Sequence, residues 1–146
     1  MQHKKQLQML VEAICKLNER QWSNPRGQFD PLNGSAMIIE EALELIGAPN
    51  PRETSRQLVE SYDELTDISR VDQFDALLDT LYITIGELHK LGATPEDITD
   101  GLQIVHNANV AKSGSKDANG KVTKPEGFVG PEEALSKLVK RFPLIA

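Results

Sequence analysis

Apolar residues recur at intervals of three and four along the chain, and this spacing restricts it to packed helices. One such segment covers residues 3–20, with Leu7, Leu10, Val11, Ile14 and Leu17. Another covers residues 69–91 and has a wider apolar face, formed by Phe74, Leu77, Leu78, Leu81, Ile85 and Leu88. No run of alternating β-branched residues indicates a strand. We therefore expect an all-α fold of the four-helix-bundle type, with a short C-terminal loop or hairpin before a last helix.

Proline, glycine and N-capping residues predict where the helices begin and end. In the first half we expect a loop over residues 21–34, a helix from an N-cap at Ser35 to Pro49 or Pro51, and a short helix from Thr54 or Ser55 to about Leu65. In the second half we expect the helix 69–91 to end at Gly92, and a further helix to begin at Thr94-Pro95 and reach about Lys112. A turn-rich segment should follow over residues 113–125, with Asn119-Gly120 at the tip of a hairpin. The last expected helix covers residues 131–141. No linker or repeat divides the chain, so residues 1–146 are predicted to form a single domain.

Charge and composition exclude several classes of protein. A net charge of -6 argues against a general nucleic-acid binder, which needs a basic surface to replace phosphate counterions. No apolar run approaches the roughly 20 residues of a membrane span, and the start of the chain has no apolar signal-peptide region. The single cysteine, Cys15, cannot form an intrachain disulfide, and we expect it in the core. These features favour a cytoplasmic protein of a reducing compartment.

Three glutamates, Glu40, Glu41 and Glu44, lie within an apolar helical run. Helical geometry places Glu41 and Glu44 one turn apart in a narrow sector, with Glu40 further toward the polar side. Beside that sector runs the main apolar stripe, formed by Ile38, Ala42, Leu45 and Ile46. Carboxylates at the rim of a buried face are unfavourable unless compensated, and a divalent cation is the simplest compensation. The alternative is the solvated edge of an ordinary helix.

Asp72, Asp75 and Asp79 repeat this pattern on the next long helix, away from its wide apolar face. Aspartate is a poor helix former, so three of them lower the stability of the helix unless they bind something. If this helix faces the glutamate helix, Asp75 and Asp79 meet Glu41 and Glu44 around one point. Such an all-oxygen site suits magnesium or manganese rather than zinc.

Motifs for other chemistries are missing: the Glu-x-x-His pairs of di-iron bundles, the zinc motifs His-Glu-x-x-His and Cys-x-x-Cys, and the Gly-x-Ser-x-Gly elbow of serine hydrolases. Four lysines instead gather within thirteen positions, namely Lys112, Lys116, Lys121 and Lys124. In an acidic protein this local positive charge could hold phosphates opposite a carboxylate-bound metal. The alternative is a solvated lysine-rich loop.

These motifs together resemble those of a known enzyme family. Glu40-Glu41-x-x-Glu44, followed by Asp75-Ala76-Leu77-Leu78-Asp79-Thr80-Leu81-Tyr82, resembles the MazG-like, all-α nucleoside triphosphate pyrophosphohydrolases. The similarity continues in His106-x-Ala108-Asn109-x-x-Lys112 and in Asp117-x-x-Gly120-Lys121-x-x-Lys124-Pro125-x-Gly127-Phe128. This second part resembles the branch that includes dimeric bacterial deoxyuridine-triphosphate pyrophosphatases. The resemblance covers about residues 36–135.

The resemblance implies roles for the matching acidic positions. The implied metal ligands are Glu41, Glu44 and Asp79, with Glu41 also catalytic and Glu40 in a supporting catalytic role. The family usually has a glutamate three residues before the aspartate of the second helix, where this chain has Ala76. Asp75, or Asp72 one turn earlier, is the available substitute.

The resemblance also implies the residues that contact the substrate. They are Asn109, Lys112, Lys121 and Lys124, and Lys112 is also a catalytic candidate because its ammonium would stabilise the departing pyrophosphate. We expect the base pocket in the loop 21–34, at Trp22 and Asn33, although Trp22 could instead pack beneath that loop.

The sequence thus predicts a Mg²⁺-dependent hydrolase that converts a (deoxy)nucleoside triphosphate, dUTP or another dNTP, to the monophosphate and pyrophosphate. Glu40 or Asp75 would orient or deprotonate the attacking water. The resemblance implies a homodimer or homotetramer whose sites draw on two chains, and we expect no nucleic-acid or membrane partner. Two alternatives remain: hydrolysis of phosphoribosyl-ATP by the same chemistry, and a non-catalytic nucleotide-binding bundle that has lost activity through Ala76.

Overall fold

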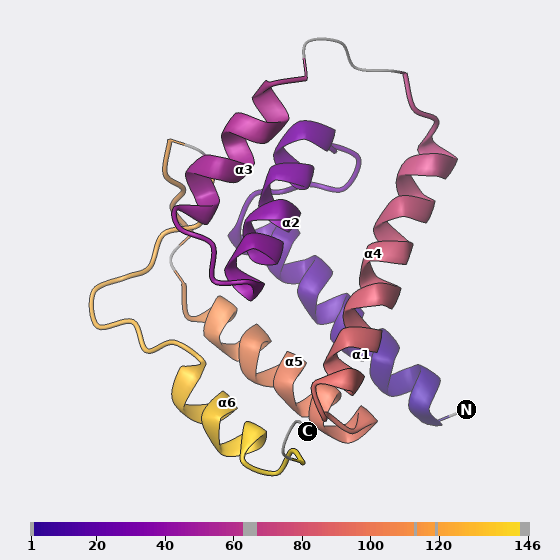
Figure 1. Cartoon of the computed structure of the whole chain (residues 1–146), viewed down its shortest axis with the longest axis vertical. Helices are drawn as coiled ribbons and strands as arrows, with labels where there is room; N and C mark the ends of the chain where they lie inside the picture. The colour runs from indigo at the N-terminus through magenta and orange to yellow at the C-terminus, as the bar shows by residue number, and fades with distance from the viewer. Residues whose placement is uncertain (1, 63–66, 113, 119, 144–146) are drawn as a thin grey trace. The chain divides into compact units, whose positions relative to one another are not determined.

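The computed structural model describes residues 2–62, 67–112, 114–118 and 120–143. Its elements are α1 (Gln2–Lys16), the π-helical turn η1 (Leu17–Gln21), α2 (Pro31–Leu45), α3 (Pro51–Glu60), α4 (Arg70–Lys90), α5 (Pro95–Val110) and α6 (Glu132–Val139) (Figure 1). Within these ranges no strand is formed, and an isolated antiparallel bridge joins Lys116 and Val122. The predicted all-α helical fold is confirmed.

The chain divides into two compact units. One, the hairpin unit, consists of residues 26–69, and the other, the main unit, consists of residues 1–25 and 70–146. This division leaves the prediction of a single domain untested. Among the described helices, none combines the length and the hydrophobicity that a membrane span requires.

In the hairpin unit, α2 begins before the predicted N-cap at Ser35. The actual cap is Asp30, whose Oδ1 accepts hydrogen bonds from the backbone N–H groups of Leu32 at 3.0 Å and Asn33 at 3.1 Å. Pro31 occupies the first helical position, where the missing N–H has no helical partner to lose. The expectation of a loop through residue 34 was wrong because Asp30-Pro31 caps a helix here instead of forming a turn.

A glycine-capped turn joins α2 to α3. Gly47 adopts a left-handed φ of 67°, and its N–H donates to the Glu44 carbonyl while the Ala48 N–H donates to the Leu43 carbonyl, both at 3.0 Å. This pair of hydrogen bonds is the Schellman motif, which satisfies the last carbonyls of a helix. α3 then starts at Pro51, earlier than the predicted Thr54 or Ser55, and the predicted end at Leu65 lies outside the described residues.

Small side chains and one carboxylate form the contact between α2 and α3. Ala36 and Ser55 are almost fully buried, and the Ser55 hydroxyl donates to the Arg52 carbonyl at 2.9 Å. Glu40 is only 5% exposed, whereas Leu45 is 80% exposed. The predicted orientation of α2 was therefore wrong: the sector of Ala36 and Glu40 faces α3, because the short turn places the small residues of the two helices against each other.

In the main unit, the bounds of α4 and α5 agree closely with prediction. Gly92, with a φ of 114°, ends α4 with a second Schellman motif. Thr94 then forms a capping box with Asp97: the Thr94 hydroxyl accepts from the Asp97 N–H at 3.1 Å, and the Asp97 carboxylate accepts from the Thr94 N–H at 3.0 Å. α5 ends at Val110, close to the predicted Lys112.

α6 packs against the first half of α5. Gly101 lacks a side chain at this contact, and a Cβ there would lie 3.5 Å from Leu138, the most buried residue of α6 at 4% exposure. Beyond α6, the Arg141 guanidinium lies 3.7 Å from the Asp97 carboxylate. The predicted C-terminal helix is confirmed, with its bounds at Glu132 and Val139.

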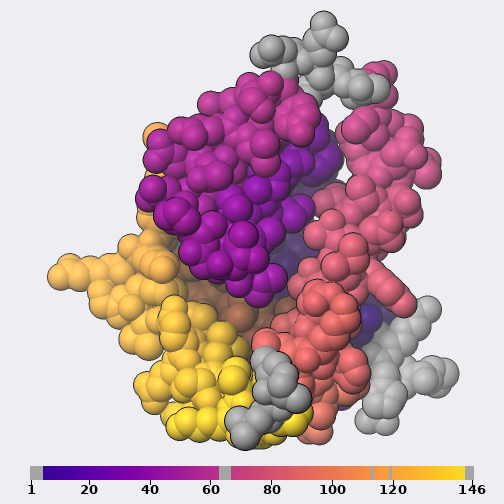
Figure 2. Space-filling view, viewed as in Figure 1, coloured from indigo at the N-terminus to yellow at the C-terminus, as the bar shows by residue number. Residues whose placement is uncertain are grey.

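Many apolar side chains of α1 and α4 are uncovered. No residue of α4 is buried, and Phe74, Leu81 and Tyr82 are 64%, 55% and 82% exposed. Figure 2 shows part of this open α4 surface in pink. Cys15 is also exposed, so its predicted place in the core was wrong, because no described segment covers its side of α1.

Candidate active site

The α2 glutamates present two different environments. Glu41 and Glu44 are exposed one turn apart, and neither carboxylate forms a hydrogen bond or ion pair with a described residue. Glu40 is buried against α3, where the Nε atoms of Arg52 and Arg56 are also buried. Glu41 and Glu44 are thus open to a ligand, whereas Glu40 belongs to the interior of the hairpin unit.

The α4 aspartates form a second open pair. Asp75 and Asp79 are exposed and lie one turn apart, and neither carboxylate is engaged by another residue in the described ranges. Asp72, the alternative ligand, does have an interaction partner. Between the pair, the Ala76 carbonyl accepts a hydrogen bond from the Thr80 hydroxyl at 2.8 Å. The use of Asp75 in place of the acidic residue missing at Ala76 stays a prediction.

The two carboxylate pairs belong to different units. Glu41 and Glu44 lie in the hairpin unit, and Asp75 and Asp79 lie in the main unit. Among the described residues, no three His, Cys, Asp or Glu side chains come close enough together to hold a metal ion. The four-carboxylate metal site therefore stays a prediction, although each pair by itself offers the hard oxygen ligands that magnesium prefers.

The predicted substrate residues Asn109 and Lys112 lie at the C-terminal end of α5, and both are half-buried. This end is held by a residue that the sequence analysis did not single out. The Gln21 side-chain amide donates to the Lys112 carbonyl at 2.8 Å and to the Val110 carbonyl at 2.9 Å. A Cβ at Gly114 would lie only 3.0 Å from the Gln21 carbonyl, so the two backbones approach closely there. We call this contact the Gln21 clamp.

The residues around Gln21 strengthen the clamp. Gln21 ends the π-helical turn η1, and π turns are frequent at functional sites. Asn24 accepts a hydrogen bond from the Lys116 ammonium, and its own amide donates to the Asn18 side chain at 3.3 Å. No local motif predicts the contacts of Gln21 with Val110 and Lys112 or of Asn24 with Lys116, since they join residues about 90 positions apart.

Trp22 adjoins the clamp and was predicted to contact the base. It is half-buried, and its indole Nε1 is buried without a hydrogen-bond partner in the described residues. Asn33, the other predicted base contact, lies in the first turn of α2, in the hairpin unit. A base contact at Trp22 stays a prediction.

The lysine-rich segment after α5 forms the predicted hairpin. The Asp117 N–H donates to the Lys121 carbonyl at 2.9 Å, and the Lys121 N–H donates to the Asp117 carboxylate at 3.0 Å. Gly120 turns the chain with a φ of 77°, while its predicted neighbour at the tip, Asn119, lies outside the described residues. Lys121 is half-buried, and its backbone is held by these two hydrogen bonds with Asp117.

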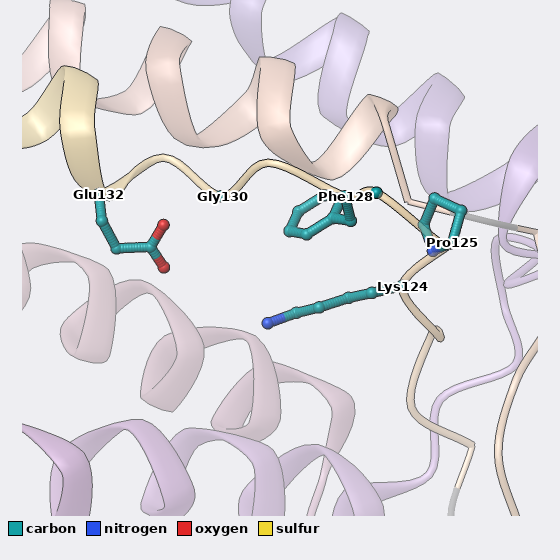
Figure 3. A pocket seen from close by; sticks show the side chains of 6 residues that line it. Lys124, Pro125, Phe128, Gly130 and Glu132 are labelled. Atoms are coloured by element: carbon teal, nitrogen blue, oxygen red, sulfur yellow. The ribbon is translucent and has the colours of Figure 1, made fainter.

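That loop contains a surface pocket of about 450 Å³. Its lining residues are Lys124, Pro125, Gly127, Phe128, Gly130 and Glu132 (Figure 3). The Lys124 ammonium lies over the Phe128 ring, 5.4 Å from its centroid. Lys124 was predicted to contact the substrate; Glu132 was not singled out, because nothing local to it indicates that the chain folds back toward Lys124.

Two carboxyl groups of the main unit have a lowered pKa. Hydrogen bonds from the Thr94 hydroxyl, and then from its backbone N–H, lower the pKa of Asp97. The Lys16 ammonium lowers the pKa of Glu12, first by a hydrogen bond and then by its charge. Neither residue is among the predicted site residues, and the largest cause of each shift is a residue within one helical turn.

Comparison with known proteins identifies the family. A family model described as phosphoribosyl-ATP pyrophosphohydrolase matches residues 10–109, which include both carboxylate pairs and Asn109. No curated protein and no solved structure gave a significant match. The matched region covers well over half of the 146 residues. The chain therefore belongs to the phosphoribosyl-ATP pyrophosphohydrolase family, within the superfamily of MazG-like, all-α pyrophosphohydrolases.

Proposed function

We propose that this protein is a Mg²⁺-dependent hydrolase that cleaves a (deoxy)nucleoside triphosphate to the monophosphate and pyrophosphate. The observation that carries the proposal is the occurrence of two open carboxylate pairs, Glu41 with Glu44 and Asp75 with Asp79, within the region matched by a pyrophosphohydrolase family. Carboxylates exposed one turn apart and not engaged by described cations are available to a hard divalent cation.

The donor chemistry of these four side chains fits magnesium, with manganese as an alternative. When bound, the cation supplies a Lewis acid for the phosphate oxygens and lowers the pKa of a water nucleophile. Asp75, which is exposed, is the better candidate for orienting that water, because the burial of Glu40 removes it from solvent. Glu40 then supports Glu41 through the backbone of α2.

Positive charge for the phosphates comes from the segment after α5. Lys112 and Lys121 would face the triphosphate and stabilise the negative charge on the departing pyrophosphate. Asn109, one turn before Lys112, would contact the sugar. The Gln21 clamp favours these roles, because it fixes the backbone of Lys112 by two hydrogen bonds.

The substrate has two candidates. The tail motif from Asp117 to Phe128 favours a deoxynucleoside triphosphate such as dUTP, through its resemblance to the deoxyuridine-triphosphate branch. The family match favours phosphoribosyl-ATP, which would be cleaved at the same anhydride bond. A non-catalytic nucleotide-binding role is the third possibility, and it predicts binding without release of pyrophosphate.

A second copy of the chain is the proposed partner. The exposed apolar residues of α4 would be covered in a homodimer or homotetramer, because large apolar patches on a protein surface commonly mark an interface. Light scattering of the Leu81→Asp variant tests this: we expect a smaller mass than for the unmodified chain. The control is Leu58→Asp, at an exposed leucine on α3. Equal masses for all three proteins would refute α4 as the interface.

The decisive experiment measures pyrophosphate release from a panel of ribo- and deoxynucleoside triphosphates and phosphoribosyl-ATP, with and without Mg²⁺. Glu41→Gln should abolish release, because the amide is a poorer metal ligand of the same size. The matched control is Glu53→Gln on α3, where the glutamate accepts a hydrogen bond from Gln57 that a glutamine carbonyl can also accept. Release that is independent of Mg²⁺, or equal in Glu41→Gln and the unmodified enzyme, would refute the proposal.

A further inference from the structure

The pocket in the loop that leads into α6 lies beyond the region matched by the family, and its chemistry is distinct from that of the carboxylate pairs. It combines an aromatic ring, an ammonium group, a carboxylate and glycine backbone within about 450 Å³. A volume of this size is typical of small-ligand sites. Figure 3 shows the Lys124 and Glu132 side chains directed toward the same space beneath the loop.

A tight turn brings the lining residues together. The Phe128 N–H donates to the Pro125 carbonyl at 3.1 Å, and Gly127 has a φ of 73° at the third position of this turn. That position of a type II turn requires a positive φ, which favours glycine. The turn therefore places the Phe128 ring beside the Lys124 side chain, and both face the pocket.

A second glycine lets the carboxylate fold inward. A Cβ at Gly130 would collide with the Glu132 carboxyl group, so the side chain lies against the bare backbone of residue 130. The Glu132 carboxylate forms no hydrogen bond or ion pair with any described residue. This exposed carboxylate is available to accept hydrogen bonds from a ligand.

The Phe128 ring is held by a contact that a ligand could replace. The Lys124 ammonium lies 5.4 Å from the ring centroid, near the outer limit of a cation–π contact, and the lysine side chain is exposed. A base stacked on an aromatic ring binds more strongly than an exposed ammonium does. A base would therefore displace the ammonium from the ring face and leave it free to donate a hydrogen bond to that base.

The polar groups restrict which base fits. An ionised carboxylate only accepts hydrogen bonds and an ammonium only donates them, so the ligand edge must offer donors beside an acceptor. Guanine presents N1–H and the N2 amino group next to its O6 carbonyl, which matches both Glu132 oxygens and the Lys124 ammonium. Cytosine and adenine offer one amino group to the carboxylate, and uracil offers a single imino group.

We propose that this pocket binds the nucleobase of a nucleotide, stacked on Phe128, with Glu132 accepting from the base and Lys124 donating to its carbonyl, and with guanine bound best. The proposal rests on the proposed function only in taking that nucleotide as the substrate, and it favours a guanine nucleotide over dUTP and phosphoribosyl-ATP, the two candidates named above. It gives Lys124 a base contact in place of the predicted phosphate contact, and it moves the base pocket away from Trp22.

The test uses the full chain and four probes: the monophosphates of guanosine, inosine, adenosine and uridine, titrated by calorimetry or NMR. Guanosine monophosphate should bind at least about fivefold more tightly than inosine monophosphate, which lacks only the N2 amino group that Glu132 would accept. Glu132→Gln should remove this difference. Glu126→Gln is the matched control, because Glu126 lies in the same turn but does not line the pocket.

Stacking is tested separately at Phe128. Phe128→Leu should weaken all four probes by about tenfold, whereas Phe128→Tyr should retain their affinity, since any aromatic ring can stack. The control is Val129→Ala, which should leave the affinity of the probes unchanged. Val129 is an exposed apolar residue of the same loop and does not line the pocket. Unchanged thermal unfolding of the variants shows that the loss is not due to misfolding.

The results separate this inference from the proposed function. Pyrophosphate release with normal KM in both Phe128→Leu and Glu132→Gln would overturn the pocket and leave the enzyme established. Guanosine monophosphate binding that depends on Phe128 and Glu132, without pyrophosphate release, would support the pocket and overturn the enzyme. Equal affinities of guanosine and inosine monophosphates would overturn the role of Glu132 as the base acceptor.

Discussion

The Gln21 clamp predicts a measurable loss of stability when its amide is removed. Gln21→Met keeps the length and helix propensity of the side chain but deletes the donor to the Val110 and Lys112 carbonyls. A net hydrogen bond is worth about 1 kcal/mol, and water can replace the donor more easily at an exposed carbonyl. The Val110 contact is exposed and the Lys112 contact is partly buried, so the expected total is about 1.5 kcal/mol.

This loss has two readouts. For a chain of 146 residues, about 1.5 kcal/mol corresponds to a Tm lower by roughly 3–6 °C. Hydrogen exchange should be faster at the amides of Ala111 and Lys112, which close the end of α5 by donating to the Asn107 and Asn109 carbonyls. Amides in the middle of α5 should lose only the protection that corresponds to the lower stability of the whole chain, because the clamp contacts only the C-terminal end of α5.

The control for this variant is Gln8→Met on α1, where the glutamine is exposed and forms no hydrogen bond with a described residue. If Gln21→Met and Gln8→Met lower the Tm equally, the clamp contributes nothing to stability. If the Tm falls but exchange at Lys112 does not change, the clamp stabilises the unit without fixing the end of α5. Either result would refute the positioning of Lys112 by Gln21.

Two further predictions concern buried carboxylates. Because its folded pKa is lowered by Thr94, Asp97 contributes stability above its unfolded pKa and loses it as pH falls through the folded value. The Tm difference between Asp97→Asn and the unmodified chain should therefore be largest near pH 7 and should shrink as pH falls below about 4. The control is Asp100→Asn, at an exposed aspartate of the same helix. A Tm difference that does not change with pH would contradict this prediction. Glu40→Ala should lower the free energy of unfolding by about 1–3 kcal/mol more than Glu41→Ala does, because Glu40 is buried and Glu41 is exposed. Both variants are unfolded with urea in the presence of a metal chelator. Equal losses of stability in the two variants would contradict this prediction.

Local signals were sufficient to predict where most helices lie. The bounds of α4 and α5 followed from Gly92 and Thr94, whose capping interactions depend only on residues within one turn. The start of α2 was missed because Asp30-Pro31 is equally typical of a turn and of a helix cap. Asp30-Pro31 caps a helix only if packing stabilises the residues that follow as a helix. In this chain α3 provides that packing.

The environment of the candidate site was harder to predict than its residues. The spacing of Glu41, Glu44, Asp75 and Asp79 correctly indicated two pairs one turn apart, since helical geometry fixes that relation. The burial of Glu40 was not predictable from the pattern, because it depends on the small Ser55 of α3 that allows close approach. The roles of Gln21 and Glu132 also depend on tertiary contacts that no periodicity reports.

The sequence separations of these contacts imply an order of folding during synthesis. The hairpin of α2 and α3 is complete in sequence once residue 60 has been made, and its contacts are local, so it can form early. The Gln21 clamp joins residues 89 and 91 positions apart and must wait until Lys112 has left the ribosome. Until then α1 and η1 remain without this anchor, so the N-terminal segment is fixed only after α5 has been made, although it is synthesised first.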